Sequence, residues 1–194
     1  DDYHIEVLDM TDPHKKRILV AMHGCENQGD PMRRVFKVMR EVVESHPDIE
    51  ISYPVHLNHV VQEASDAILG HHKRIHLIDP LDVVDFHNLA ARSYFIMTDS
   101  GGVQEEAPSL GKPVLVLRDT TERPEGVEAG TLKLVGTDPT MVKTAMLQLL
   151  DDPTEYRRMA EAKNPYGDGH ASRRILDAIL YDFGKIQNRP APFK

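Results

Sequence analysis

At 194 residues, of which 40% are hydrophobic, the chain is long enough for one domain with a proper core. Its net charge of −8 argues against a general nucleic-acid or membrane surface, but it allows a small anionic ligand held by a few local donors. A single cysteine, Cys25, excludes an internal disulfide framework and fits a reducing, cytoplasmic compartment. No apolar stretch predicts a signal peptide or a membrane span.

The first residues predict a linker that enters a domain. Residues 1–16 are polar, contain Pro13 and the basic pair Lys15-Lys16, and do not begin with Met. We therefore expect the parent protein to continue upstream. The domain proper should cover residues 17–182, and residues 183–194 should form an extended or mobile tail.

Short apolar runs then alternate with stretches of helical periodicity. Each run has the length and composition of a buried strand and is followed by glycine, proline or polar residues. The six predicted strands are residues 17–22, 49–55, 74–78, 93–97, 113–117 and 131–135. The alternation predicts an α/β fold with a mostly parallel sheet covered by helices on both faces.

The helices predicted between the strands have recognisable starts and stops. Pro31 suits the first turn of the first helix, with Asp30 as its cap. Further helices are predicted over residues 60–69 and 82–92, from Ser100 to about Gly111, from Thr137 or Asp138 to about Leu150, after Pro153, and around residues 175–180. Residues 118–124 are predicted to be a charged loop.

Polar residues of the types that bind ligands or take part in reactions follow the predicted strands. They are His23, His56, Asp79-Pro80, Ser100 and the loop 118–123. In parallel sheets, ligands bind in the loops beyond the carboxyl ends of the strands. We therefore expect these residues to converge on one rim of the sheet.

The turn Ser100-Gly101-Gly102 stands between an apolar strand and a run of helix formers. Ser100 suits an N-cap, and the two glycines leave backbone N–H groups open to a ligand that comes close. This arrangement predicts an anion site, such as one for phosphate. A capped helix without any ligand is the simpler alternative.

Other candidates lie around this turn. Glu106, about one and a half turns beyond Ser100, could accept hydrogen bonds from sugar hydroxyls, although a solvated first-turn acid is the alternative. Arg118 and Arg123 are potential counter-ions for a phosphate, and His23 could act as a general acid or base. No metal-ligand spacing, Walker loop or Gly-x-Gly-x-x-Gly motif is present, which weakens zinc, kinase and NAD interpretations.

Several longer motifs carry a family resemblance. They are residues 53–58 (YPVHLN), 98–113 (TDSGGVQEEAPSLGKP), 118–125 (RDTTERPE), 135–138 (VGTD) and 164–169 (NPYGDG). From about residue 17 to 180 the chain resembles the bacterial non-hydrolysing UDP-N-acetylglucosamine 2-epimerases. The resemblance implies the glycosyltransferase-B architecture, in which two Rossmann-like domains flank a nucleotide-sugar cleft, with this chain as the C-terminal, UDP-binding domain.

The resemblance also implies roles for individual residues. Ser100, Gly101 and Gly102 would hold the diphosphate, Glu106 the ribose hydroxyls, Phe86 the uracil, Arg123 part of the sugar nucleotide, and His23 would be the active-site histidine. The implied reaction interconverts UDP-GlcNAc and UDP-ManNAc by eliminating and re-adding UDP, with neither NAD nor a metal. A homodimer and a place in cell-wall or capsule polysaccharide biosynthesis are also implied.

Two departures from the family pattern qualify these expectations. The family usually has His-Arg-Arg-Glu-Asn where this chain has His23-Gly24-Cys25-Glu26-Asn27, so two cations are missing near a regulatory UDP-GlcNAc site that His56 would adjoin. The N-terminal domain, which supplies the family's catalytic carboxylates, is also missing, so the isolated chain should be inactive. A UDP-sugar glycosyltransferase half and a non-catalytic nucleotide-sugar sensor are the alternative functions.

Overall fold

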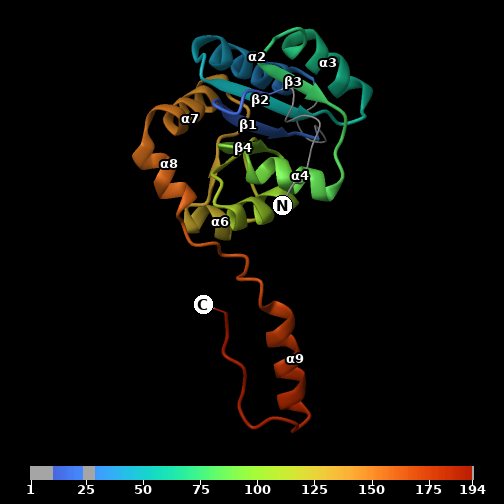
Figure 1. Ribbon diagram of the computed structural model, residues 1–194, viewed down its shortest axis with the longest axis vertical. Helices are drawn as coiled ribbons and strands as arrows, with labels where there is room; N and C mark the ends of the chain where they lie inside the picture. Colours follow the sequence, from blue (N-terminus) through green and yellow to red (C-terminus); the bar gives the residue numbers. More distant parts are fainter. Residues whose placement is uncertain (1–10, 24–28, 194) are drawn as a thin grey trace.

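The structure is a computed structural model that describes residues 11–23 and 29–193 (Figure 1). The first ten residues of the predicted linker, together with Gly24 and Cys25, lie outside the described residues. Within the described ranges, no helix has both the length and the apolarity needed to cross a membrane.

The described residues contain a six-stranded sheet in which all paired strands are parallel, in the order β3-β2-β1-β4-β5-β6. The strands are β1 (Lys16–Ala21), β2 (Ile49–Pro54), β3 (Ile75–Ile78), β4 (Phe95–Thr98), β5 (Val114–Val116) and β6 (Leu132–Leu134). Their apolar runs are continuous because both faces of the sheet are buried. The predicted parallel sheet is confirmed.

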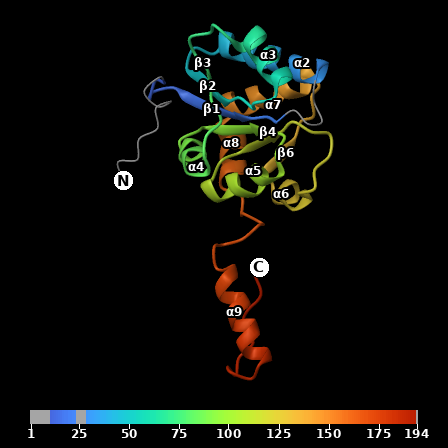
Figure 2. The same ribbon diagram turned by 90° about the vertical axis from the view of Figure 1, so that its right-hand side faces the viewer.

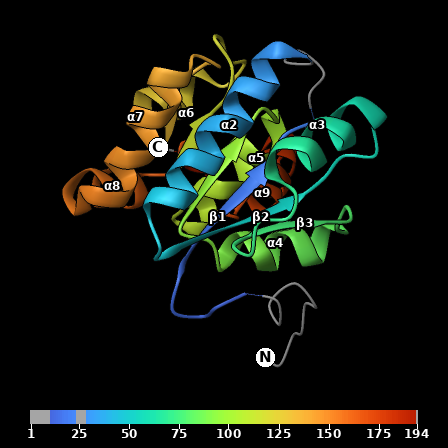
Figure 3. The same ribbon diagram turned by 90° about the horizontal axis from the view of Figure 1, so that it is seen from above.

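Helices form a layer on each side of the sheet (Figure 2). One layer contains α2 (Asp30–Ser45), α3 (His59–Leu69) and α7 (Pro139–Asp151), and the other contains α4 (Val83–Ala91), α5 (Gly101–Glu106) and α6 (Pro124–Ala129). The helix α8 (Pro153–Ala160) runs from the end of α7 towards the second layer (Figure 1). Alternate residues of β1 enter opposite cores: Ile18 and Val20 pack under α2, whereas Leu19 and Ala21 pack with α4 and α5 residues. Seen from above, α2 lies between α3 and α7 (Figure 3).

One predicted helix cap is wrong, and another is confirmed in position only. Asp30 is the first residue of α2, and the N-cap is Gly29, whose φ of 84° is accessible to glycine at little cost. Ser100 does occupy the N-cap position of α5 with extended backbone angles, but its side chain makes no capping hydrogen bond. Asp138, by contrast, caps α7 by accepting from the backbone N–H groups of Thr140 and Met141.

Two helical segments also differ from the prediction. The helix after Ser100 ends at Glu106 and continues as the short 3₁₀ segment η1 (Ala107–Leu110), which stops at Gly111 with a φ of 66°. Pro108 in this segment cannot donate a backbone hydrogen bond, which favours the break in the α-helix. The helix α6, which begins at Pro124 directly after the charged loop, was not predicted.

The last helix, α9 (Ala171–Asp182), stands away from the layered domain, and the chain turns back beside it toward the C-terminus (Figures 1 and 2). The predicted helix is therefore present, but none of its residues is buried. The predicted domain limits, 17–182 with a separate tail, stay a prediction.

Candidate functional site

The carboxyl ends of β1, β2 and β4, the segment after β3, and the helices α4 and α5 surround a cavity of about 390 Å³. Its position follows from the strand order, because the chain winds outward in opposite directions from β1 and from β4. A crevice between two such strands is where α/β sheets bind ligands. The cavity is lined by Ala21, Met22, His23, Pro54, His56, Pro80, Leu81, Asp82, Val83, Phe86, His87, Ser100, Gly102, Val103 and Glu106.

Most residues singled out in the sequence meet at this cavity. His23, His56, Phe86, Ser100, Gly102 and Glu106 line it. Gly101 does not line the cavity, but it adjoins Arg123: a Cβ added to Gly101 would lie 3.7 Å from the Arg123 Nη2 atom. The expected convergence of strand-end residues on one rim is confirmed as an arrangement, while their roles stay predictions.

The turn that carries Ser100 is held to the neighbouring strand by Thr98. The fully buried hydroxyl of Thr98 donates to the backbone oxygen of Ala21 at 2.7 Å and accepts from the backbone N–H of Ser100 at 3.0 Å. The end of β4 is therefore fixed to the end of β1, beside the cavity that Ala21 and Ser100 line. Gly102, which follows, is exposed to solvent.

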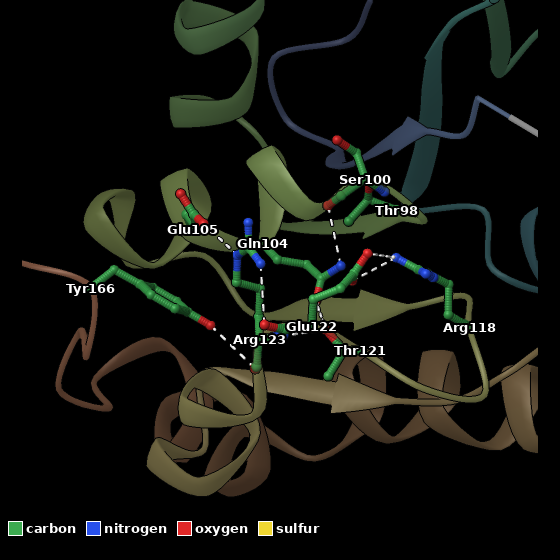
Figure 4. Close-up of polar contacts among 9 residues, drawn as sticks. All are labelled: Thr98, Ser100, Gln104, Glu105, Arg118, Thr121, Glu122, Arg123 and Tyr166. Carbon is green, nitrogen blue, oxygen red and sulfur yellow. Dashed lines mark hydrogen bonds and ion pairs between the residues drawn. The ribbon is translucent and has the colours of Figure 1, made fainter. Parts of the chain in front are cut away.

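The loop after β5 reaches the same turn through a buried glutamine (Figure 4). The Thr121 hydroxyl donates to Oε1 of Gln104 at 2.6 Å and accepts from the backbone N–H of Arg123 at 3.0 Å. The Arg123 side chain forms an ion pair with Glu105. This loop therefore places one guanidinium group next to the glycine turn.

Arg118, the other predicted counter-ion, has a different environment. Its Nη1 atom contacts both carboxylate oxygens of Glu122, at 2.7 and 2.9 Å, within the loop (Figure 4). This hydrogen bond lowers the pKa of the Glu122 carboxyl. Arg118 does not line the cavity, so Arg123 is the better placed of the two cations.

The opposite side of the cavity is formed by α4. Phe86 is half-buried there, and the next residue, His87, holds Glu106 through a contact of 2.9 Å between Nε2 and Oε2. Sequence reasoning gave His87 no role, because its partner lies on another helix 19 residues away. The contact leaves the second carboxylate oxygen of Glu106, on a half-exposed side chain, with room to accept other donors.

The third side of the cavity is the end of β1 with His23. The backbone N–H of His23 donates to Oδ1 of Asp99 at 2.9 Å, and its ring Nδ1 lies 3.5 Å from the same oxygen. The hydrogen bond to Asp99 raises the pKa of His23, and partial burial opposes the rise. The His56 ring lies edge-on to the His23 ring, with centroids 5.7 Å apart.

Asp99 is a site residue that sequence reasoning did not single out. It follows β4 directly, as His23 almost directly follows β1, and β1 pairs with β4. Positions just beyond paired parallel strands lie side by side. The signal available in the sequence was therefore that Asp99 and His23 both follow predicted strands. An acidic partner of this kind fixes the orientation of a histidine ring.

Taken together, these residues have the chemistry that an organic anion would need. The glycine turn and Arg123 supply donors for a charged group, Phe86 supplies an apolar surface, and Glu106 can accept from hydroxyls. Within the described ranges, no group of three or more His, Cys, Asp or Glu residues is arranged to hold a metal ion.

Comparisons with known proteins agree with this chemistry. A family model described as UDP-N-acetylglucosamine 2-epimerase matches residues 2–180. A Bacillus subtilis (strain 168) protein named UDP-N-acetylglucosamine 2-epimerase is 57% identical over 193 residues, which is 100% of this chain and 50% of that protein. An Escherichia coli (strain K12) protein of the same name is 52% identical over 168 residues, covering 87% of this chain and 45% of that protein.

A solved structure of similar fold contains a nucleotide. The Staphylococcus aureus MnaA–UDP co-structure matches with a TM-score of 0.92 and 52% identity, and covers 100% of this chain and 53% of that chain. The chain thus spans about half the length of the curated relatives it matches. The predicted fold class, a Rossmann-like domain forming one half of a glycosyltransferase-B type architecture, is confirmed.

Proposed function

Because the chain belongs to the UDP-N-acetylglucosamine 2-epimerase family, we propose that it is the UDP-binding half of an enzyme that interconverts UDP-GlcNAc and UDP-ManNAc. The observation that carries this proposal is the cavity at the β1–β4 crevice, where the Ser100–Gly102 turn and Glu106 lie together with Arg123 at its border. The names of the relatives favour an epimerase over a glycosyltransferase or a sensor.

Each part of UDP has a matching group in the cavity. The diphosphate would lie against the turn of Ser100, Gly101 and Gly102, where a charge-assisted hydrogen bond from Arg123 reaches it. The uracil would pack near Phe86, and the ribose hydroxyls would donate to Glu106, which His87 holds in place. These roles agree with the order of uracil, ribose and diphosphate along one molecule.

The chemistry is an elimination followed by an addition. A base removes the proton from C2 of the sugar, the C2–H electron pair becomes a C1=C2 double bond, and UDP leaves with the electrons of the C1–O bond. UDP then adds back to C1 while C2 receives a proton on the opposite face. This chain binds the leaving group, and His23, with its Asp99 partner, lies on the same cavity as an acid–base group.

The remaining half of the protein would supply the other wall of the cleft. Supporting this view, α9 presents exposed apolar side chains that a free helix would not favour: Ile175 is 60% exposed and Ile179 is 50% exposed. We assign this surface to the half of the family length that the chain does not span. A homodimer, a cytoplasmic setting and a role in cell-wall or capsule polysaccharide synthesis complete the proposal.

Binding of UDP tests the site directly. By isothermal titration calorimetry, the chain should bind UDP, and Ser100→Asp should weaken binding by at least about a hundredfold, because a new carboxylate faces the diphosphate. Ser172→Asp, an exposed serine in the first turn of α9, adds the same charge far from the cavity and should leave binding unchanged. Equal UDP affinity in Ser100→Asp and the wild type would refute the site.

Turnover tests the division of labour between the two halves. The 194-residue chain should not epimerise UDP-GlcNAc, whereas a protein that adds the family's other half should. Proton NMR of the sugar C2 position in deuterium oxide measures the exchange. Exchange catalysed by the isolated chain would show that the second half is unnecessary for the chemistry.

A further inference from the structure

A buried side chain, Gln104, joins the glycine turn to the loop that carries Arg123 (Figure 4). Gln104 is 0% exposed, and its Nε2 donates to the backbone oxygen of Ser100 at 3.2 Å. Its Oε1 accepts from the Thr121 hydroxyl at 2.6 Å. A buried polar side chain with both ends bonded holds its partners at a fixed separation.

The direction of each hydrogen bond that links Ser100, Gln104, Thr121 and Arg123 follows from the groups involved. The Ser100 backbone oxygen can only accept, so the Gln104 amide nitrogen must face it and the amide oxygen must face Thr121. The Thr121 hydroxyl therefore donates to Gln104, and its lone pair accepts from the backbone N–H of Arg123 at 3.0 Å. No alternative amide orientation satisfies the same atoms.

The Arg123 side chain is held by exposed contacts, an ion pair with Glu105 and a hydrogen bond to the backbone oxygen of Glu122 at 3.1 Å. Its ion pair with Glu105 joins side chains that are 32% and 44% exposed, and such pairs contribute little to stability. A phosphate ligand would compete with Glu105 for the guanidinium. The backbone of Arg123, held by Thr121, keeps its place when that exchange happens.

We propose that Gln104 and Thr121 are positioning residues that hold Arg123 beside the Ser100–Gly102 turn. Arg123 and the turn can then bind the same diphosphate. The inference rests on the proposed function and deepens it, because it assigns the spacing of the diphosphate site to two residues that need not touch the ligand. Their effect is confined to the charged part of the nucleotide, whereas uridine binds mainly at Phe86 and Glu106.

The decisive test compares two neighbouring threonines. Thr121→Val keeps the side-chain shape but removes the hydroxyl, whereas Thr120→Val makes the same change at an exposed residue outside the hydrogen-bond chain. We expect Thr121→Val to weaken UDP binding about tenfold and to leave uridine binding within about twofold, as loss of a partly buried hydrogen bond predicts. Thr121→Ser should restore UDP binding, and Thr120→Val should match the wild type.

Two further measurements complete the test. Gln104→Met keeps a side chain of similar size without the amide, and it should likewise weaken UDP binding while leaving uridine binding nearly unchanged. Thermal unfolding of each variant checks that the protein is folded. In the Thr121→Val background, Arg123→Gln should cost less UDP affinity than in the wild type.

The outcomes separate the inference from the function on which it rests. Equal losses of UDP and uridine binding in Thr121→Val and Gln104→Met would indicate a purely structural role and overturn the inference. Unchanged UDP binding in both variants, with a wild type that binds UDP, would also overturn it while the proposed function stands. A wild-type chain that binds no UDP would overturn both.

Discussion

The two ends of the cavity are built differently. At the Ser100 end, the buried side chain of Thr98 joins the turn to the end of β1, and that of Gln104 joins it to the Arg123 loop. At the His23 end, the ring is 50% exposed and faces Asp99 at 3.5 Å, with His56 exposed beside it. One end is therefore braced by the core of this domain, and the other is open to solvent.

This difference matches the proposed roles of the two ends, which are binding of the leaving group and acid–base chemistry. A leaving group that must be held in one place requires preformed donors, which a network of satisfied buried groups provides. The open end, by contrast, has the acid–base group but no enclosing wall, which fits a site completed by another half of the protein. Four predictions, in order of decreasing effect, test whether the two ends are independent.

The largest effect should come from Gly126, which lies in α6 directly after the Arg123 loop. A Cβ at this position would lie 2.3 Å from the Tyr166 hydroxyl and 2.4 Å from Cδ1 of Leu132. Gly126→Ala should therefore reduce the free energy of unfolding by about 3 kcal/mol, as overpacking of a filled site does. Urea unfolding measures the loss, and Glu128→Ala, an exposed change in the same helix, should show little. An equally stable Gly126→Ala variant would mean that this packing is loose.

Arg123 should matter next, and only for charged ligands. Arg123→Gln should weaken UDP binding about thirtyfold, since a charge-assisted hydrogen bond to the diphosphate is lost. Calorimetry should show no change for uridine. Arg173→Gln, which removes the same charge from the exposed face of α9, is the control. If both variants weaken UDP equally, the effect is one of net charge and the braced end has no special role.

Glu106 should give a smaller and chemically selective loss. Glu106→Ala should weaken UDP binding about fivefold by removing an acceptor of ribose hydroxyl hydrogen bonds. Binding of 2′,3′-dideoxy-UDP, which lacks both hydroxyls, should be the same in the variant and the wild type. Glu63→Ala on α3 removes an exposed carboxylate elsewhere and should change neither ligand. A fivefold loss for the dideoxy ligand as well would place Glu106 away from the ribose.

The smallest effect should come from the open end. Asp99→Asn should lower the pKa of His23, because the hydrogen bond to Asp99 is the main cause of its rise. A raised folded-state pKa stabilises the protein fully below about pH 6.5, and this contribution is lost as pH rises through the raised value. Histidine NMR titration, assigned with His23→Gln, measures the shift. UDP affinity should stay unchanged in Asp99→Asn, and a large loss would show that the two ends are coupled.

The sequence predicted the arrangement of the fold because the strands are fully buried. A continuous apolar run can be recognised without its neighbours, and consecutive parallel strands bring their following loops to the same edge. His23, His56 and Ser100 could therefore be grouped before any coordinates were known. Local details were less accessible. Gly29, not Asp30, is the N-cap of α2, and Ser100 occupies the N-cap position of α5 without a side-chain capping hydrogen bond, because the backbone geometry decides both.

Partners distant in the sequence could not be predicted at all. Gln104 is a residue type that is common in helices, so nothing in the sequence marks it. Its role depends on Thr121, which lies 17 residues further along the chain. The pairing of His87 with Glu106 likewise depends on the packing of α4 beside α5. The helix α6 was missed because its six residues are mostly charged or small, so no periodic apolar face marks it.

The order of the strands has a practical consequence. Because all strands run the same way, every loop that enters a strand lies at the edge opposite the cavity, as does the turn at residues 70–74 between α3 and β3. His71 in this turn is exposed and already adopts a φ of 58°. A fluorescent label or an affinity tag inserted there should leave the cavity open, so that the proposed UDP binding can be measured on an immobilised chain.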